Sequence, residues 1–127
     1  MIAPKYEKQR RKPKPPTGFT PAQRAVILHR DGGLCGLCGK PGATEVNHRS
    51  NRGVGGDRTK NVTSNGCAIH GTCNGLIEAD TGCAKDALAL GVKLHSWDDP
   101  TVERFWMWAV GEWVLLDDEG GWIEVTK

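Results

Sequence analysis

The sequence predicts a small α+β fold, and three observations lead to that prediction. Short helix-like and strand-like segments alternate along the 127 residues. Cysteine and histidine residues occur in two closely spaced groups, at 35–38 and 67–73. The last third of the chain carries aromatic and β-branched residues in the alternation typical of strands and ends in a hairpin-like segment.

Length and composition limit the classes of protein that this chain can be. A chain of 127 residues can form one domain with a small core. No run of apolar residues is long enough to span a membrane, and residues 1–16 contain no apolar segment of the kind found in secretory signals. We therefore expect a cytoplasmic protein, with no membrane partner. Its odd number of cysteines, five, then indicates metal binding rather than disulfides.

Helix signals are clearest near the start of the chain. Thr20 can cap a helix and Pro21 suits its first position, so we expect a helix over 21–30 that ends at Asp31-Gly32-Gly33. Its apolar face would contain Ala25, Val26, Ile27 and Leu28. Two more short helices are expected over 74–80 and 83–92, the second with Gly91 at the C′ position.

Strands are expected on both sides of a long loop and again near the end of the chain. ATEVNH (43–48) and Cys67–Ile69 flank a loop rich in glycine and arginine. RFWMWAV (104–110) and EWVLL (112–116) are strand-like, and a hairpin turned at 118–121 should complete the chain. We expect the five tryptophans to form core and hairpin rather than to stack on bases, because acidic residues surround them.

Charge is distributed unevenly along the chain. Residues 1–60 hold 13 Lys/Arg against 4 Asp/Glu, a net charge of +9, whereas residues 61–127 hold 4 against 11, a net charge of −7. Residues 1–17, with six Lys/Arg and four Pro, should be a disordered basic arm. The basic half indicates a polyanionic partner such as nucleic acid, although a solubilising tail would have the same composition.

Cys35-Gly-Leu-Cys38-Gly39 has the form of a zinc knuckle, one half of a tetrahedral site. Either Cys67 with His70, or His70 with Cys73, has the spacing to supply the other half. A closed site of four ligands would be structural. A redox Cys-x2-Cys is the main alternative, but no βαβ pattern surrounds it.

The arrangement between the two groups resembles that of the HNH endonucleases, in particular the small phage-type members. Glu45-Val46-Asn47-His48 matches their first histidine at a strand end, Asn65 their central asparagine, and Asn74 the residue directly after the last zinc ligand. The spacing matches if His70 replaces the family's third cysteine, which gives a structural Zn²⁺ on Cys35, Cys38, His70 and Cys73. Cys67 and Cys83 would then be small apolar residues, and His29 and His95 structural.

The resemblance implies a zinc-stabilised ββα-metal (His-Me finger) fold with flanking helices and a C-terminal β-hairpin. It covers residues 18–127, with the zinc and ββα core at 35–80 and the C-terminal helix and hairpin at 82–127. His48 would be the general base, and Asn65 would pin the loop that positions it. Asn47, Asn74 and Glu78 would hold a catalytic Mg²⁺ or Mn²⁺, and Arg49 and Arg52 would contact DNA phosphates.

One departure from the family pattern concerns the catalytic ion. The family usually has Asp or His before the catalytic histidine, and this chain has Asn47. Two neutral amides make a weak Mg²⁺ site, and Glu78, four residues after Asn74 on the same helix face, would supply charge.

The resemblance thus predicts an endonuclease that hydrolyses DNA phosphodiesters and leaves 5′-phosphates, acting as a monomer or weak dimer. In a phage-encoded member it would work in the host cytoplasm, with phage packaging proteins among its partners. A zinc-stabilised DNA- or protein-binding adaptor that lost catalysis through Asn47 is the second interpretation, and a thiol-redox protein is the third.

Overall fold

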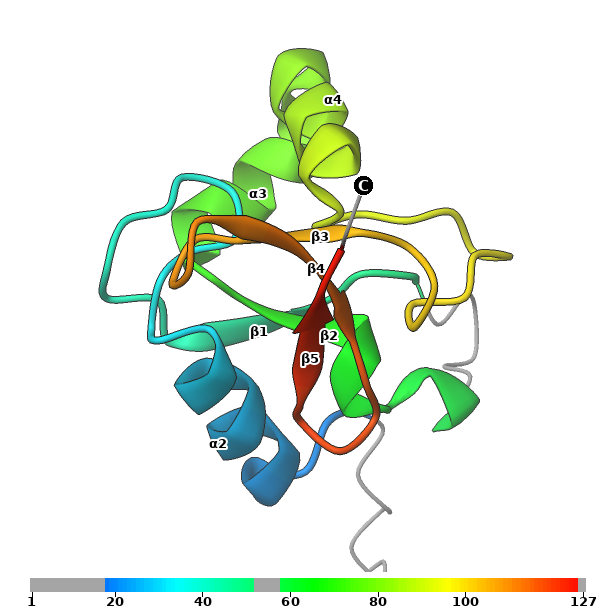
Figure 1. The fold of residues 1–127 in the computed structure, drawn as a ribbon. Helices are drawn as coiled ribbons and strands as arrows, with labels where there is room; N and C mark the ends of the chain where they lie inside the picture. The colour runs from blue at the N-terminus through cyan, green and yellow to red at the C-terminus, as the bar shows by residue number, and fades with distance from the viewer. Residues whose placement is uncertain (1–17, 52–57, 126–127) are drawn as a thin grey trace, which may run out of the picture.

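The computed structural model describes residues 18–51 and 58–125 (Figure 1). This part of the chain contains three α-helices and two small antiparallel sheets, which confirms the predicted α+β class. The basic arm expected at 1–17 lies outside the described residues. None of the described helices is both long and apolar enough to cross a membrane.

The first described helix, α2 (Pro21–Arg30), has the predicted bounds. Thr20 Oγ1 accepts a hydrogen bond from the Gln23 backbone, and the Gln23 side chain accepts one from the Thr20 backbone, a complete capping box. The predicted apolar face is wrong in part, because Ala25 and Val26 are exposed. The helix packs through Ile27 and Arg30, which lie one turn apart on the same face.

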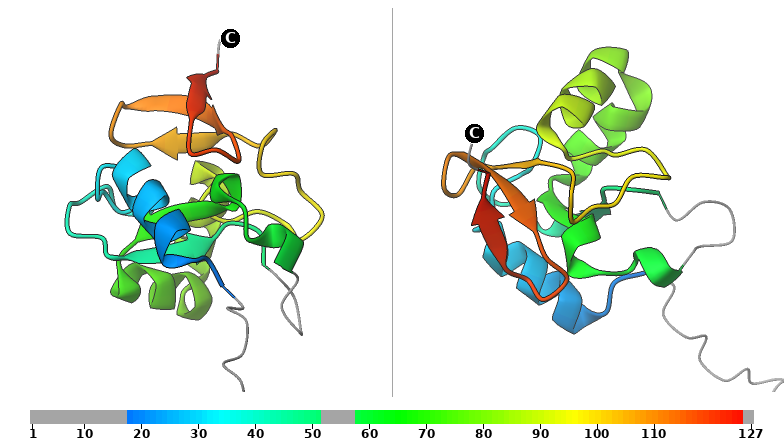
Figure 2. Two further views of the ribbon diagram at one scale, coloured as in Figure 1. Left: turned by 90° about the horizontal axis from the view of Figure 1, so that it is seen from below. Right: turned by 45° about the vertical axis from the view of Figure 1, so that its right-hand side comes forward.

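Strands β1 (Glu45–His48) and β2 (Gly66–Ile69) pair antiparallel, with Asn47 opposite Cys67 and His48 opposite Gly66. Because side chains alternate along a strand, His48 and Asn47 point to opposite faces of this sheet. His48 stacks on Phe19, the residue just before the cap of α2. Asn47 bonds to Val92, which follows α4, and α2 and the α3–α4 pair lie on opposite sides of the sheet (Figures 1 and 2).

Helices α3 (Gly71–Ala79) and α4 (Thr81–Leu90) follow β2, separated by Asp80 alone. Asp80 ends α3 and caps α4, its Oδ1 accepting hydrogen bonds from the backbone of Gly82 and Cys83. Helix α3 begins three residues earlier than predicted, because His70 serves as its N-cap. Gly91 ends α4 with a φ of 77°, at the predicted position.

The C-terminal sheet has the order β3 (Phe105–Met107), β4 (Glu112–Leu116), β5 (Trp122–Glu124), with the hairpin turn where the sequence predicts it. One face contributes Phe105, Met107, Val114 and Leu116 to the core. The tryptophans were expected in core and hairpin. Trp122 lies in the hairpin and packs against the core, but no tryptophan is fully buried and Trp97 is 79% exposed. Trp106 packs edge-on against Trp108 and Trp113.

Two short 3₁₀ turns, η1 (Arg58–Lys60) and η2 (Thr63–Asn65), lead from the long loop back into β2. The second turn is wholly buried, so the chain entering β2 is part of the core rather than of the surface.

Candidate metal centre and active site

Cys35, Cys38, His70 and Cys73 form the one group of His, Cys, Asp and Glu residues in the described chain that could hold a metal ion. Their ligand atoms all lie within 4.8 Å of one another. His70 Nδ1 is 3.3 Å from Cys38 Sγ and 4.0 Å from Cys73 Sγ. Tetrahedral zinc with ordinary bond lengths separates sulfur and nitrogen ligands by about 3.6 Å. The four residues therefore fit a zinc ion, and the set includes Cys73 rather than Cys67.

Hydrogen bonds around this group orient its ligands for metal binding. His70 Nε2 lies 2.9 Å from the Pro41 carbonyl, to which it donates, and this leaves the Nδ1 lone pair directed at the sulfurs. Cys35 Sγ accepts from the His70 backbone at 3.5 Å. Burial raises the pKa of Cys35, but N–H groups of Cys38, His70 and Leu37 outweigh it, and the net pKa is lowered.

Crowding of the thiols acts in the opposite direction at Cys73. Burial and the neighbouring Cys35 and Cys38 raise its pKa to about 12. A divalent cation among the three sulfurs offsets this repulsion between thiolates, which is what a structural zinc supplies.

The knuckle turn is held in place by Trp108. Gly39 has a φ of 73°, and a Cβ there would come within 2.7 Å of the Trp108 ring. Trp108 Nε1 also donates to the Gly36 carbonyl at 2.8 Å. A glycine after the second cysteine is thus required both by the backbone and by this ring.

Neither remaining cysteine belongs to the metal group. Cys67 is fully buried on β2, and burial, followed by the charge of Asp31, raises its pKa to about 12. Cys83 lies half-buried on α4 rather than fully in the core.

His48, the predicted general base, ends β1 and is half-buried. Its ring stacks on Phe19 at a centroid distance of 4.2 Å, and its Nε2 lies 2.8 Å from Asn61 Oδ1. Donation from Nε2 to that oxygen places the lone pair of the neutral ring on Nδ1. The Phe19 stack and the Asn61 hydrogen bond together therefore fix the orientation of the His48 ring.

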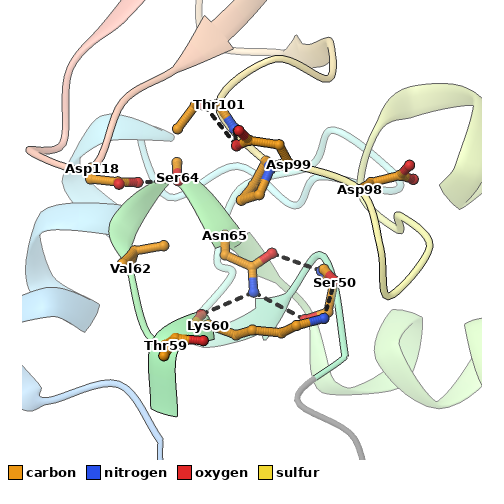
Figure 3. Close-up of a pocket in the computed structure, with 11 residues that line it drawn as sticks. Ser50, Thr59, Lys60, Val62, Ser64, Asn65, Asp98, Asp99, Thr101 and Asp118 are labelled. Atoms are coloured by element: carbon orange, nitrogen blue, oxygen red, sulfur yellow. Dashed lines mark hydrogen bonds between the residues drawn. The ribbon is translucent and has the colours of Figure 1, made fainter. Parts of the chain in front are cut away.

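Asn65 bonds the backbone on both sides of the long loop. Its Oδ1 accepts from the Ser50 N–H at 2.8 Å, and its Nδ2 donates to the Ser50 and Lys60 carbonyls, each at 3.0 Å (Figure 3). The Asn65 carbonyl accepts from the Arg49 N–H at 2.7 Å. These are the contacts expected of a residue that fixes the chain directly after His48.

Asn47, the first predicted ligand of the catalytic ion, is 6% exposed. Its Nδ2 donates to the Val92 carbonyl at 3.1 Å and lies 3.9 Å from Cys67 Sγ. Within the described residues its Oδ1 accepts no hydrogen bond. A buried acceptor without a donor is uncommon, and it is an atom that a cation could use.

Asn74 and Glu78 lie one turn apart on α3, the first half-buried and the second exposed. Glu78 lines a groove of about 370 Å³ that Asn51 and Lys93 also border. The described residues contain no second cluster of carboxylates or histidines, so an ion bound here would depend on amide oxygens and on Glu78.

Arg49 does not fit the predicted phosphate contact. Its side chain has no exposed surface, and its five N–H donors point at the carbonyl oxygens of Gly91, Ser64, Pro100, Glu103 and Arg104, at 2.7 to 3.4 Å. Burial, the main cause, lowers its pKa to about 10. The residue joins distant segments of the fold. Arg52, the other predicted contact, lies outside the described residues.

Sequence reasoning missed the segment after α4. Residues 91–95 run beside 47–51 and bond to them one after another, through the Gly91 and Val92 carbonyls, Lys93 Nζ, the Leu94 N–H and the His95 carbonyl. No periodicity marks 91–95, so only tertiary structure shows that this segment covers the end of β1.

Comparisons of the chain with protein-family models, with curated proteins and with solved structures find no match.

Proposed function

We propose that the protein is a metal-dependent endonuclease of the HNH type, which hydrolyses DNA phosphodiesters to 5′-phosphate products. The observation that carries the proposal is the arrangement of His48, Asn65 and α3 around one antiparallel strand pair. His48 ends β1, Asn65 fixes the backbone that follows it, and α3 starts at a zinc-type ligand immediately after β2.

The residues near the end of β1 would have separate tasks in this reaction. His48 takes a proton from a water molecule, whose oxygen attacks phosphorus while the bond to the 3′ oxygen breaks. Phe19 and Asn61 hold the imidazole ring during that transfer. A general base must be neutral to accept that proton, and imidazole is the side chain best suited to that task.

Asn47, next to His48 at the end of β1, supports an ion site at this end of the sheet through its buried oxygen. Asn47 Oδ1 with Asn74 and Glu78 from α3 would hold Mg²⁺ or Mn²⁺, with phosphate oxygens completing its shell. Such an ion, when bound, stabilises negative charge on the phosphate and on the leaving oxygen. The Cys₃His group would hold Zn²⁺ only to fix the knuckle against α3, since it offers no open coordination position.

One observation favours the second candidate, a DNA- or protein-binding adaptor without catalysis. Asn47 is neutral, nearly buried and tied through its nitrogen to Val92. An ion there would have only one carboxylate, that of Glu78, among its proposed protein ligands. Mg²⁺ would therefore bind weakly, which favours the adaptor over the nuclease.

Nicking of supercoiled plasmid in a divalent metal series separates the two candidates. The nuclease proposal expects open-circular product with Mg²⁺ or Mn²⁺ and little with Ca²⁺, and ligatable nicks that carry 5′-phosphate. The adaptor interpretation expects retention of DNA without cleavage in every metal.

A further inference from the structure

The structure leaves the candidate active site without its predicted phosphate contact at Arg49, and another cation lies beside it. Lys93 belongs to the 91–95 segment, between two residues that are bonded to the end of β1. Val92 accepts a hydrogen bond from Asn47, and the Leu94 N–H donates to the Arg49 carbonyl at 2.7 Å. The backbone of Lys93 is therefore fixed next to the residues that flank His48.

The Lys93 side chain extends toward the loop that follows His48. Its Nζ donates to Asn51 Oδ1 at 3.2 Å, the one hydrogen bond that this ammonium group makes to the described residues. An ammonium group has three donors, so two remain for phosphate oxygens. Lys93 is half-buried, and its stem is held while its charged end reaches solvent.

No acidic side chain neutralises Lys93 within the described chain. It forms no ion pair with Glu78, although both line the groove of about 370 Å³ between α3, α4 and Asn51. Lys60, by contrast, uses its Nζ on Ser50 Oγ at 2.8 Å and the Ser96 carbonyl at 2.5 Å. Of the cations bonded to residues 49–51, Lys93 keeps the most donor capacity for a ligand.

We propose that Lys93 binds a DNA phosphate at the groove between α3, α4 and Asn51, in the role that the sequence assigned to Arg49. This inference rests on the proposed function for its ligand, and the groove suits a phosphate because Lys93 has two N–H donors there that bond to no described residue. Glu78, one of the proposed ligands of the divalent ion, lines the same groove.

The test measures duplex DNA binding by fluorescence anisotropy, with the full-length zinc-loaded protein and Ca²⁺ in place of Mg²⁺ to suppress cleavage. One phosphate contact contributes about 0.9 to the slope of log Kd against log salt. Lys93→Gln should lower the slope by that amount and weaken binding several-fold, whereas Lys93→Arg should retain it. Lys85→Gln, an exposed lysine on α4, is the matched control and should leave the slope unchanged.

Equal slopes for Lys93→Gln and Lys85→Gln, or a wild-type protein that does not bind duplex DNA, would overturn the inference. Plasmid nicking by the same samples keeps this result apart from the proposed function. A slope loss at Lys93 in a protein that never nicks supports phosphate binding and counts against the nuclease. Nicking by a Lys93→Gln protein whose salt slope is unchanged supports the nuclease and counts against phosphate binding by Lys93.

Discussion

The buried Arg49 offers the sharpest test of the fold, because the sequence and the structure assign it different roles. In the structure its guanidinium is a cross-link between segments that are 15 to 55 residues apart in the chain. Replacement with methionine keeps most of the side-chain volume and removes every donor. The prediction is a large loss of stability rather than a specific loss of DNA binding.

The size of the loss follows from the acceptors. The Gly91 and Ser64 carbonyls are bonded to Arg49 in the buried interior, and leaving them unpaired costs roughly 2–6 kcal/mol together. The other three lie nearer the surface, where water can replace Arg49, and cost roughly 0.5–1.5 kcal/mol each. Methionine also removes a charge that is unfavourable to bury. Burial lowers the pKa of Arg49 to about 10, and this corresponds to about 3 kcal/mol, which offsets part of the lost stability. We expect a net loss of roughly 0.5–7.5 kcal/mol, centred near 4 kcal/mol.

Urea unfolding followed by tryptophan fluorescence measures this difference, with Arg24→Met as the control. Arg24 makes one long contact, at 3.5 Å to the Thr44 carbonyl, so its replacement should cost less than about 0.5 kcal/mol. Equal midpoints for the two variants would refute the cross-link. Normal stability combined with a reduced salt slope for DNA binding at Arg49→Met would restore the phosphate role.

Two further predictions concern the cysteines. Elemental analysis should find one zinc per chain, lost in Cys38→Ser but kept in Cys83→Ser. Structural zinc contributes roughly 10–16 kcal/mol to folding, which is comparable with the stability of a whole domain. The Cys38→Ser variant should therefore also unfold at a much lower urea concentration. Zinc retained by Cys38→Ser would refute that ligand set. The pKa of Cys67 is near 12 in the folded protein and about 9 in the unfolded chain. The stability that this thiol contributes is therefore fully present below pH 9 and is lost as the pH rises from 9 to 12. The free energy of unfolding should therefore fall by about 1.4 kcal/mol between pH 8 and pH 10. Cys67→Ala should remove that fall. An equal fall in the variant would show that Cys67 is not the group responsible.

Local signals account for what the sequence predicted well. The capping of α2 depends on Thr20, Pro21 and Gln23, and the end of α4 on Gly91, all of which act within one turn of the helix. The two closely spaced ligand pairs likewise limited the metal group to a few combinations. In each case the responsible residues are neighbours in the chain.

Long-range contacts account for what it did not predict. Arg49 looked like a phosphate ligand because it is a cation in a basic, glycine-rich loop, but its acceptors lie as far away as Arg104. Trp108 looked like a core residue, and instead it is 38% exposed and packs on Gly39, 69 positions earlier in the chain. The position of Lys93 depends on how residues 91–95 cross the end of β1, for which no short pattern exists.

The measurement that bears most directly on the proposed nuclease is plasmid nicking by His48→Ala beside His29→Ala. His29 lies exposed on α2 and has no part in the proposed site, so its variant controls for loss of a histidine. Both proteins should bind zinc and unfold at similar urea concentrations. The proposal predicts nicking with Mg²⁺ or Mn²⁺ by wild type and His29→Ala, and a rate reduced roughly 10²–10⁴-fold by His48→Ala. Activity that survives in the His48 variant would contradict it.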